Sequence, residues 1–285
     1  MIRSGWHAVD PLRRPVLFIN PRSGGGKATR AGLVEQARES GIDVVVVGRD
    51  KPLAALVDEA VARGADALGI AGGDGSLAVV AAAALAHGLP FVCVPAGTRN
   101  HFALDLGVDR HDLVGSLDAF TDGVERRIDV AEVNGRLFLN NVSLGIYGDA
   151  VRQPTYRDAK AQTLLETAAH VLGPSAAAVD LKLIDNRGRA HLNPAVVLVS
   201  NNPYSLEPPH APGTRRTLDG GELGILVLDP PRLGQSPGHT WTATRLELTA
   251  PAPLHAGIDG EAVDLTPPLR FAIRPRALRV RLRRP

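Results

Sequence analysis

Short apolar runs alternate with helical stretches over residues 15–130. The apolar runs are rich in β-branched side chains, and several are followed by a glycine-rich turn and then by a helical pattern. The predicted strands are 16–19, 42–47, 66–71 and 91–94, and the predicted helices are 27–40, 53–63 and 76–87. This repetition predicts a parallel sheet with helices on both faces, in which ligands bind at the carboxyl ends of the strands.

After residue 126 the pattern changes to strands separated by tight turns. Asn134-Gly135 is one such turn, and pairs of this kind favour antiparallel hairpins. The predicted strands are 129–133, 136–141, 179–184, 195–200, 223–228 and 242–249, with one helix over 158–172 and a long Pro- and Gly-rich loop over 204–221. We therefore predict an α/β domain over 1–125 and a β-rich domain over 126–285, whose last strand can pack back on the first domain.

Composition narrows the function classes. The 285 residues carry 32 basic and 30 acidic side chains, a net charge of +2, and only 4% aromatics, which argues against a nucleic-acid partner. A single cysteine excludes a disulfide framework and a Cys-rich zinc site. No apolar run is long enough to span a membrane, and the first residues lack the apolar segment of a signal peptide. We expect a cytoplasmic protein, with peripheral contact at the inner membrane face left open.

Two glycine-rich turns follow predicted strands. The first, NPRSGGGK over residues 20–27, is not a Walker A loop because Ala28 follows the lysine. The second, GGDGS over residues 72–76, places one carboxylate, Asp74, among glycines. Glycine lets the backbone approach a phosphate closely, and the helix start that follows favours an anion. Asp74 would orient Mg²⁺ or help to take a proton from an attacking hydroxyl; a plain turn is the alternative for both segments.

Two further motifs carry polar groups. PAGTRNH, over residues 95–101, follows the next strand and offers Thr98 and Asn100 to a phosphate or a metal-bound water. IDGE, over residues 258–261, taken alone, is most often a hairpin turn.

In this order the four motifs resemble the diacylglycerol kinase catalytic-domain family, which includes bacterial diacylglycerol kinases, sphingosine kinases and ceramide kinases. The resemblance covers about residues 15–282. It implies an α/β nucleotide domain followed by a β-sandwich-like domain, with the active cleft between them. It also implies transfer of the γ-phosphate of Mg-ATP to a hydroxyl of a diacylglycerol- or sphingoid-like lipid at a membrane surface.

The resemblance also assigns residues. Glu261 matches the proposed catalytic base, with Asp74 or Asp259 nearby, and Mg²⁺ enters with ATP. The implied nucleotide contacts are Asn20, Pro21, Arg22, Ser23, Gly24, Gly72, Gly73, Asp74, Gly75, Ser76, Thr98 and Asn100.

Two departures from the family pattern bear on metal binding and activity. His101 and Gly220 stand where the family has aspartates that belong to the water network of a structural magnesium. Weak candidates to hold that ion are Thr217, Asp219 and Glu222, and we expect the structural Mg²⁺ to be absent or weak. The alternatives to a lipid kinase are a nucleotide- or lipid-binding homologue with weakened catalysis and, less favoured, an NAD kinase-like enzyme.

The remaining charged residues are less specific. Seven arginines fall within the last sixteen residues, which predicts an edge strand with one basic face; attraction to anionic lipid headgroups is the functional alternative. Histidines such as His191 and His239 have no metal-ligand spacing. The sequence sets no oligomeric state and leaves a homodimer open.

Overall fold

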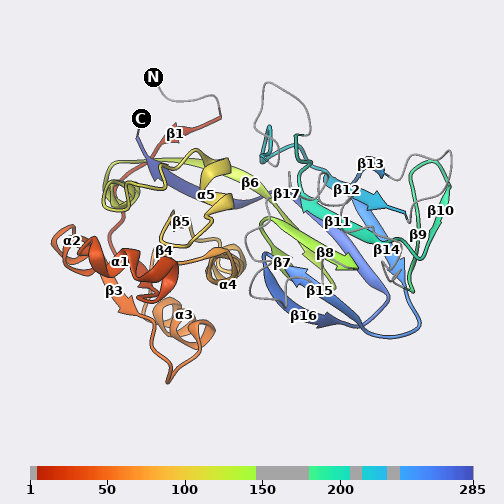
Figure 1. Ribbon diagram of the computed structural model, residues 1–285. Coiled ribbons are helices and arrows are strands. Elements are labelled where there is room, and N and C mark those ends of the chain that lie inside the picture. The colour runs from red at the N-terminus through yellow and green to blue at the C-terminus, as the bar shows by residue number, and fades with distance from the viewer. Residues whose placement is uncertain (1–4, 146–179, 206–213, 230–237, 285) are drawn as a thin grey trace. The chain divides into compact units, whose positions relative to one another are not determined.

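The computed structural model describes residues 5–145, 180–205, 214–229 and 238–284. The chain forms two compact units (Figure 1). Unit 1 comprises Met1–Ile128 and Arg276–Pro285, and unit 2 comprises Asp129–Pro275. Two long strands, β6 (Gly123–Val133) and β17 (Leu269–Arg283), run from one unit into the other. The helix predicted over 158–172 lies outside the described residues.

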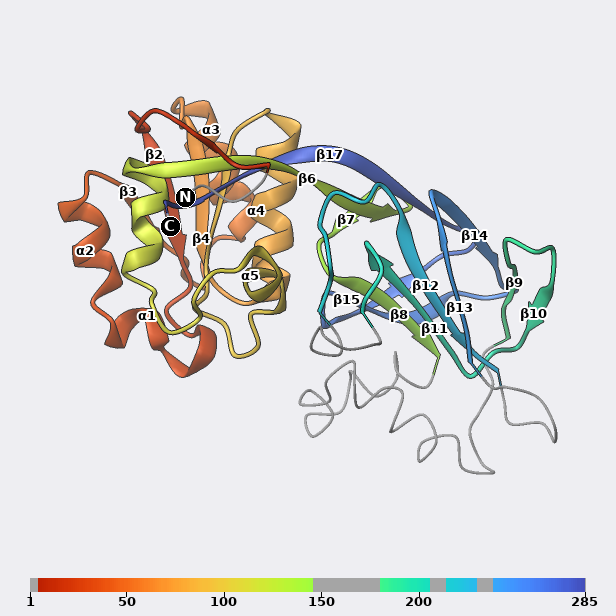
Figure 2. The ribbon, with the colours of Figure 1, turned by 90° about the horizontal axis from the view of Figure 1, so that it is seen from above.

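Unit 1 is built on a parallel sheet with helices on both faces, as predicted (Figure 2). The strands lie in the order β5 (Phe91–Val94), β4 (Ala67–Ala71), β2 (Pro15–Ile19) and β3 (Asp43–Val46). Every residue of β2 and β4 is buried, because a strand covered on both faces presents no side to solvent. For the same reason both strands are continuous apolar runs in the sequence and could be predicted from it.

The helices of unit 1 divide between the two faces of the sheet. Leu17 and Ile19 of β2 share one apolar cluster with side chains of α1, α2 and α6, while α3 and α4 lie on the opposite face (Figure 2). The helix predicted over 27–40 is two helices, because Gly32 adopts a φ of 59° between them. The helical elements are η1 (Ser23–Gly25), α1 (Lys27–Arg30), α2 (Leu33–Glu39), α3 (Leu53–Ala62), α4 (Asp74–Ala86), α5 (His101–Leu106), η2 (Gly115–Leu117) and α6 (Asp118–Thr121). In the described part of the chain, no helix has both the length and the apolar character needed to cross a membrane.

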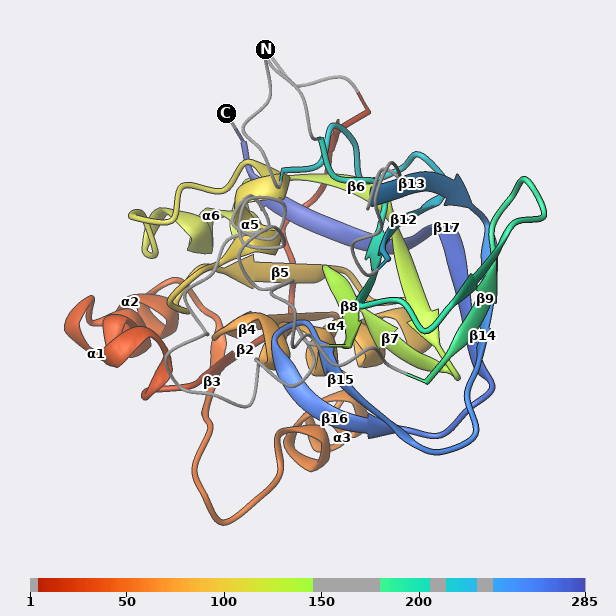
Figure 3. The same cartoon turned by 45° about the vertical axis from the view of Figure 1, so that its right-hand side comes forward.

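Unit 2 is a β-sandwich, as the family resemblance implied (Figure 3). One sheet has the order β13 (Gly238–Ala243), β12 (Leu223–Leu228), β11 (Val196–Asn201), β8 (Asn141–Gly145), β15 (Leu254–Ile258) and β16 (Glu261–Leu265), with every pair antiparallel. The strands facing it are β10 (Ala190–Leu192), β9 (Lys182–Ile184), β14 (Arg245–Thr249), part of β17, and the pair of β6 with β7 (Arg136–Phe138). One apolar cluster draws on strands of both sheets, and Phe138 and Phe271 meet edge to face in it with ring centroids 6.4 Å apart.

The C-terminal strand corrects one expectation from the sequence. β17 is not an edge strand, because it pairs with β14, β5 and β6. Its arginines are not a free basic face either, since most have carboxylate partners. In unit 1, β6 also pairs with β1 (His7–Ala8). The carboxylate of Glu125, on β6, forms ion pairs with both Arg279 and Arg281. Arg283 pairs with Asp112 at 2.5 Å. The alternation of arginine and apolar residues is thus explained by ion pairing on an interior strand.

Candidate functional site

Three of the motifs meet at one edge of the parallel sheet in unit 1. Residues 20, 72 and 95 directly follow β2, β4 and β5, which are adjacent and parallel. The carboxyl ends of adjacent parallel strands lie at the same edge, which brings the loops together. The N–H of Asn20 donates to the carbonyl of Ala71 at 3.0 Å and links the first loop to the end of β4.

The three loops pack backbone against backbone. Lys27 Nζ donates to the carbonyl of Gly97 at 3.1 Å, so the first loop is bonded to the third. A Cβ added to Gly24 would lie 2.5 Å from the carbonyl oxygen of Ala96, and one added to Gly97 would lie 2.7 Å from Cα of Gly73. A side chain at either position would force the loops apart, so glycine is required by the packing itself.

The loop of residues 72–76 leaves room beside Gly73, the residue that caps the N-terminus of α4. Gly73 has extended backbone angles (φ −88°, ψ 172°), which any residue adopts, and a Cβ there would have no described atom within 4 Å. The packing of the loop therefore does not require glycine at this position. The first amide groups of α4 and the positive end of its dipole are suited to an anion, and the predicted contact of Gly73 with a phosphate stays a prediction.

Asp74 lies in the first turn of α4 and is half-buried. Burial, and to a smaller extent the negative charge of Asp74, raise the pKa of the Cys93 thiol. The carboxylate of Asp74 is therefore close enough to β5 for its charge to be felt there. A carboxylate beside a phosphate-binding helix start is also where a magnesium ion brought by a nucleotide would be held.

Other predicted residues of unit 1 divide between exposed and buried positions. Thr98 is exposed and accessible to a ligand, and Ser76 is half-buried in the first turn of α4. Asn100 is only 1% exposed, and its Nδ2 donates to the carbonyls of Pro95 (3.1 Å) and Gly97 (2.9 Å). In the structure Asn100 holds the third loop, and its predicted contact with the nucleotide stays a prediction.

The first loop is shaped by its own asparagine. Asn20 Oδ1 accepts the N–H of Arg22 at 3.1 Å, and its carbonyl accepts the N–H of Ser23 at 3.2 Å. These bonds turn the chain directly after β2 and place the following glycines beside the third loop. Pro21 lies within this turn, and its predicted contact with the nucleotide stays a prediction.

The fourth motif forms a two-residue hairpin turn between β15 and β16 in unit 2 (Figure 3). Asp259 and Gly260 have φ of 48° and 84°, as a type I′ turn requires, and Ile258 pairs with Glu261 across it. Glu261 projects from the first position of β16 with 56% of its side chain exposed, and its nearest described partner is Arg136, whose Nη2 lies 3.8 Å from Oε2. A carboxylate placed this way is accessible to an acceptor hydroxyl.

Asp259 has a different environment from Glu261. Its carboxylate is buried and accepts three backbone N–H groups, from Leu139 at 2.8 Å, Asn140 at 2.7 Å and Asn141 at 3.1 Å. The same bonds explain why β7 ends at Phe138, although a strand was predicted over 136–141: the next three N–H groups are turned toward a side chain. In the structure, the side chain of Asp259 fixes the hairpin that carries Glu261. The predicted catalytic role of Asp259 stays a prediction.

Comparison with known proteins assigns the family. A Pseudomonas aeruginosa (strain PAO1) protein named "Probable lipid kinase YegS-like" is 30% identical over 290 residues, covering 94% of this chain and 93% of the relative. The family profile described as "Diacylglycerol kinase catalytic domain" matches residues 14–133. The chain belongs to the diacylglycerol kinase catalytic-domain family. This is the family that the four motifs indicated.

Two other comparisons agree with this assignment. The protein named "Diacylglycerol kinase" of Bacillus subtilis (strain 168) is 31% identical over 170 residues, covering 56% of this chain and 54% of the relative. A crystal structure of a diacylglycerol kinase from Bacillus anthracis (strain Sterne) superposes with a TM-score of 0.70 at 18% identity, covering 96% of this chain and 98% of that one. At that identity the superposition shows the shared fold.

In this family member the polar groups of the loop of residues 217–222 are bonded within the loop and to Asn202. The hydroxyl of Thr217 donates to Oδ1 of Asp219, and Asn202 Oδ1 accepts the N–H of Gly220 at 3.1 Å. Gly220 adds no side-chain oxygen, whereas Mg²⁺ and Ca²⁺ sites need about six or more oxygens. The loop therefore offers few ligand oxygens to a structural magnesium, and the weak candidacy of Thr217, Asp219 and Glu222 stays a prediction.

A buried polar network that the sequence did not predict lies behind this loop. Asp129 is fully buried, and its Oδ2 accepts the N–H of Gly221 at 2.6 Å and Nδ2 of Asn202 at 2.9 Å. Arg215 Nη1 donates to the carbonyls of Leu139 (2.6 Å) and Asn201 (2.9 Å). The Asn201-Asn202 pair at the end of β11 was the available signal, but Asp129 lies 73 residues from Asn202 in sequence and 92 residues from Gly221.

Proposed function

We propose that this family member is an ATP-dependent lipid kinase that transfers the γ-phosphate of Mg-ATP to a hydroxyl of a diacylglycerol- or sphingoid-like lipid. The observation that carries the proposal is the set of three packed loops in unit 1, with open space at Gly73 beside the start of α4. Such a set of loops is suited to hold phosphates, and the chain belongs to a family of lipid kinases, which supports the proposal.

Each part of the reaction has a residue or loop in the proposal. The amides at the start of α4 bind the phosphates. Asp74 would hold the Mg²⁺ that enters with ATP, and that ion would supply charge neutralisation at the transferred group. Glu261 takes the proton of the acceptor hydroxyl as its oxygen bonds to the γ-phosphorus, while the bond to the β-γ bridging oxygen breaks and ADP leaves. Positioning and charge neutralisation carry most of the rate in such a transfer.

The test is phosphorylation of a panel of acceptors with γ-labelled ATP. Diacylglycerol, monoacylglycerol, sphingosine and ceramide are presented in mixed micelles, and NAD is included as the competing acceptor. We expect a labelled phosphomonoester lipid and no labelled NADP. Labelled NADP would replace the lipid acceptor with a dinucleotide. If ATP raises the melting temperature but no acceptor is labelled, the chain is a binding homologue, as His101 and Gly220 would favour.

A second prediction tests the phosphate cradle by itself. Gly73→Ala is expected to lower ATP affinity by about tenfold or more, because the methyl group occupies the space where a phosphate approaches the backbone. Its effect on unfolding free energy should stay within about 1 kcal/mol, since the backbone is extended and the space around it is open. Isothermal titration calorimetry and denaturant unfolding measure the two quantities.

Gly97→Ala is the matched control. Its Cβ would lie 2.7 Å from Cα of Gly73, so this substitution destabilises the loops in the absence of ligand. ATP binding by Gly73→Ala with the affinity of the parent chain would show that phosphates do not pack at this position.

A further inference from the structure

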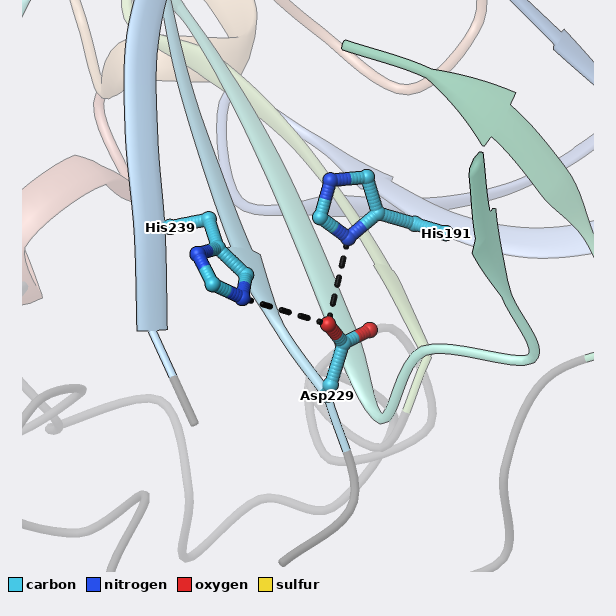
Figure 4. Close-up of side chains that lie close together, drawn as sticks. All are labelled: His191, Asp229 and His239. Atoms are coloured by element: carbon cyan, nitrogen blue, oxygen red, sulfur yellow. Dashed lines mark hydrogen bonds and ion pairs between the residues drawn. The ribbon is translucent and has the colours of Figure 1, made fainter. Parts of the chain in front are cut away.

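Two histidines and an aspartate from separate strands of unit 2 converge at one point (Figure 4). His191 is the central residue of β10, Asp229 directly follows β12, and His239 is the second residue of β13. His191 Nδ1 lies 3.1 Å from Asp229 Oδ2, and His239 Nε2 lies 3.5 Å from the same oxygen. All three donor atoms lie within 4.8 Å of one another.

The imidazole of His191 lies between two carboxylates. It is only 2% exposed, and its second nitrogen, Nε2, is buried without a hydrogen bond, 3.5 Å from Asp185 Oδ2. A neutral imidazole donates from one nitrogen and accepts at the other. If Nε2 carries the proton toward Asp185, the lone pair of Nδ1 faces the carboxylate of Asp229. That contact is repulsive unless a cation, either a proton or a metal ion, stands between them.

The surroundings hold the ring in this orientation. Trp241 stacks on His191 with an interplanar angle of 11° and centroids 5.7 Å apart. The carboxylate of Asp185 lies behind the imidazole and is held in place by the backbone N–H groups of Arg187 and Arg189, each at 2.9 Å, and by Nε of Arg189 at 3.0 Å. A carboxylate in this place orients a metal-ligating histidine and raises its basicity.

We propose that His191 Nδ1, Asp229 Oδ2 and His239 Nε2 bind a transition-metal ion of the Zn²⁺ class. Tetrahedral zinc with bonds of about 2.0–2.1 Å separates its ligand atoms by roughly 3.3 Å, which two of the three pairs already match. His239 is partly exposed, so a side-chain rotation closes the third distance. Two imidazoles and one carboxylate suit zinc better than Mg²⁺ or Ca²⁺, which prefer oxygen ligands only.

A fourth ligand position can be filled by water. A cavity of about 480 Å³ lies beside the cluster, lined among others by Asp185, His239 and Trp241, and it leaves room for a water molecule on the ion. The ion would join the β9–β10 hairpin to the β12–β13 pair, which belong to the two different sheets of the sandwich. Its role is to cross-link the sheets and so to stabilise unit 2, because a site formed only by folding adds binding energy to folding.

Metal titration in the absence of ATP and lipid tests the proposal independently of kinase activity. The chain is freed of metal with a chelator, and ZnCl₂ is titrated by calorimetry at pH 7.5. We expect one ion bound per chain and a higher melting temperature for the zinc-loaded protein. His239→Ala should weaken binding by about 100-fold or more, because it removes one of three protein ligands from a partly exposed position. Asp185→Asn should weaken binding by about 10- to 100-fold.

His255→Ala is the matched control. His255 Nδ1 lies 2.5 Å from Asp264 Oδ1 in an exposed pair, so it is a histidine–carboxylate contact outside the cluster, and the variant should bind zinc as the parent chain does. Co²⁺ provides a spectroscopic readout: tetrahedral nitrogen and oxygen ligation gives visible absorption that His239→Ala loses. Equal zinc affinity in the parent chain and His239→Ala, or no binding by the folded parent chain, would overturn the site. The second result would leave a proton between His191 and Asp229.

Discussion

Replacing Glu261 with glutamine is expected to lower phosphoryl-transfer turnover by about 10²- to 10⁴-fold and to leave ATP affinity unchanged. Glutamine keeps the shape of the side chain but cannot take a proton from the acceptor hydroxyl. The hairpin should persist, because its turn is fixed by the carboxylate of Asp259 and by the positive φ of Asp259 and Gly260, which the substitution does not change. Initial rates at saturating ATP measure the effect, and calorimetry measures the affinity.

Glu247→Gln is the control for this prediction. Glu247 is a second exposed glutamate beside an arginine, with 53% of its side chain exposed and Oε2 lying 3.0 Å from Nε of Arg270. Its neutralisation removes a charge and an ion pair of the same kind without touching the proposed base, so turnover should not change. If Glu261→Gln keeps the turnover of Glu247→Gln, Glu261 takes no part in the reaction.

Of the substitutions considered, Glu125→Gln is expected to lower the free energy of unfolding most. Its side chain is 5% exposed, and it accepts Arg279 Nε at 2.6 Å and Arg281 Nε at 3.2 Å. Arg281 is itself buried, so Glu125→Gln leaves a buried positive charge without its counter-charge. Removing one partner of such an ion pair costs about 3–5 kcal/mol. Denaturant unfolding followed by circular dichroism measures the loss.

The effect of Glu125 should depend on pH. Burial by itself raises the pKa of Glu125, but its bonds to Arg279 and Arg281 lower it below the ordinary value of 4.5. A carboxyl group with a lowered folded-state pKa contributes stability above its unfolded-state pKa and loses that contribution as the pH falls through the folded-state value. The stability difference between the parent chain and Glu125→Gln should therefore be full at pH 7 and shrink below about pH 4.5.

Glu59→Gln provides the comparison for an exposed pair in the same unit. Glu59 pairs with Lys51 at the surface, where both side chains are about half exposed, and such pairs contribute at most about 1 kcal/mol. Equal losses for Glu59→Gln and Glu125→Gln would show that the buried pair adds no stability beyond that of a surface contact.

The strands and loops of unit 1 could be predicted because their causes are local. β2 and β4 are continuous apolar runs, since both faces of a parallel sheet are covered, and glycine-rich loops follow them. The Asp259-Gly260 turn could also be predicted, because a two-residue hairpin turn needs positive φ at both residues and an Asp-Gly pair adopts it readily. The break at Gly32 was missed, since an apolar periodicity continues through residues 27–40 and does not reveal a change of backbone direction.

The sequence by itself determined the succession of strands and helices, the family and the residues from which a phosphate site can be built. Tertiary structure alone decided that β17 is an interior strand, that Asp259 fixes the end of β7 from 118 to 120 residues away, and that His191 and His239 meet at Asp229. The physical reason is the range of the interactions. Strand and turn preferences act between neighbours along the chain, whereas a buried carboxylate or imidazole takes whichever partner the folded backbone brings to it, at any separation in sequence.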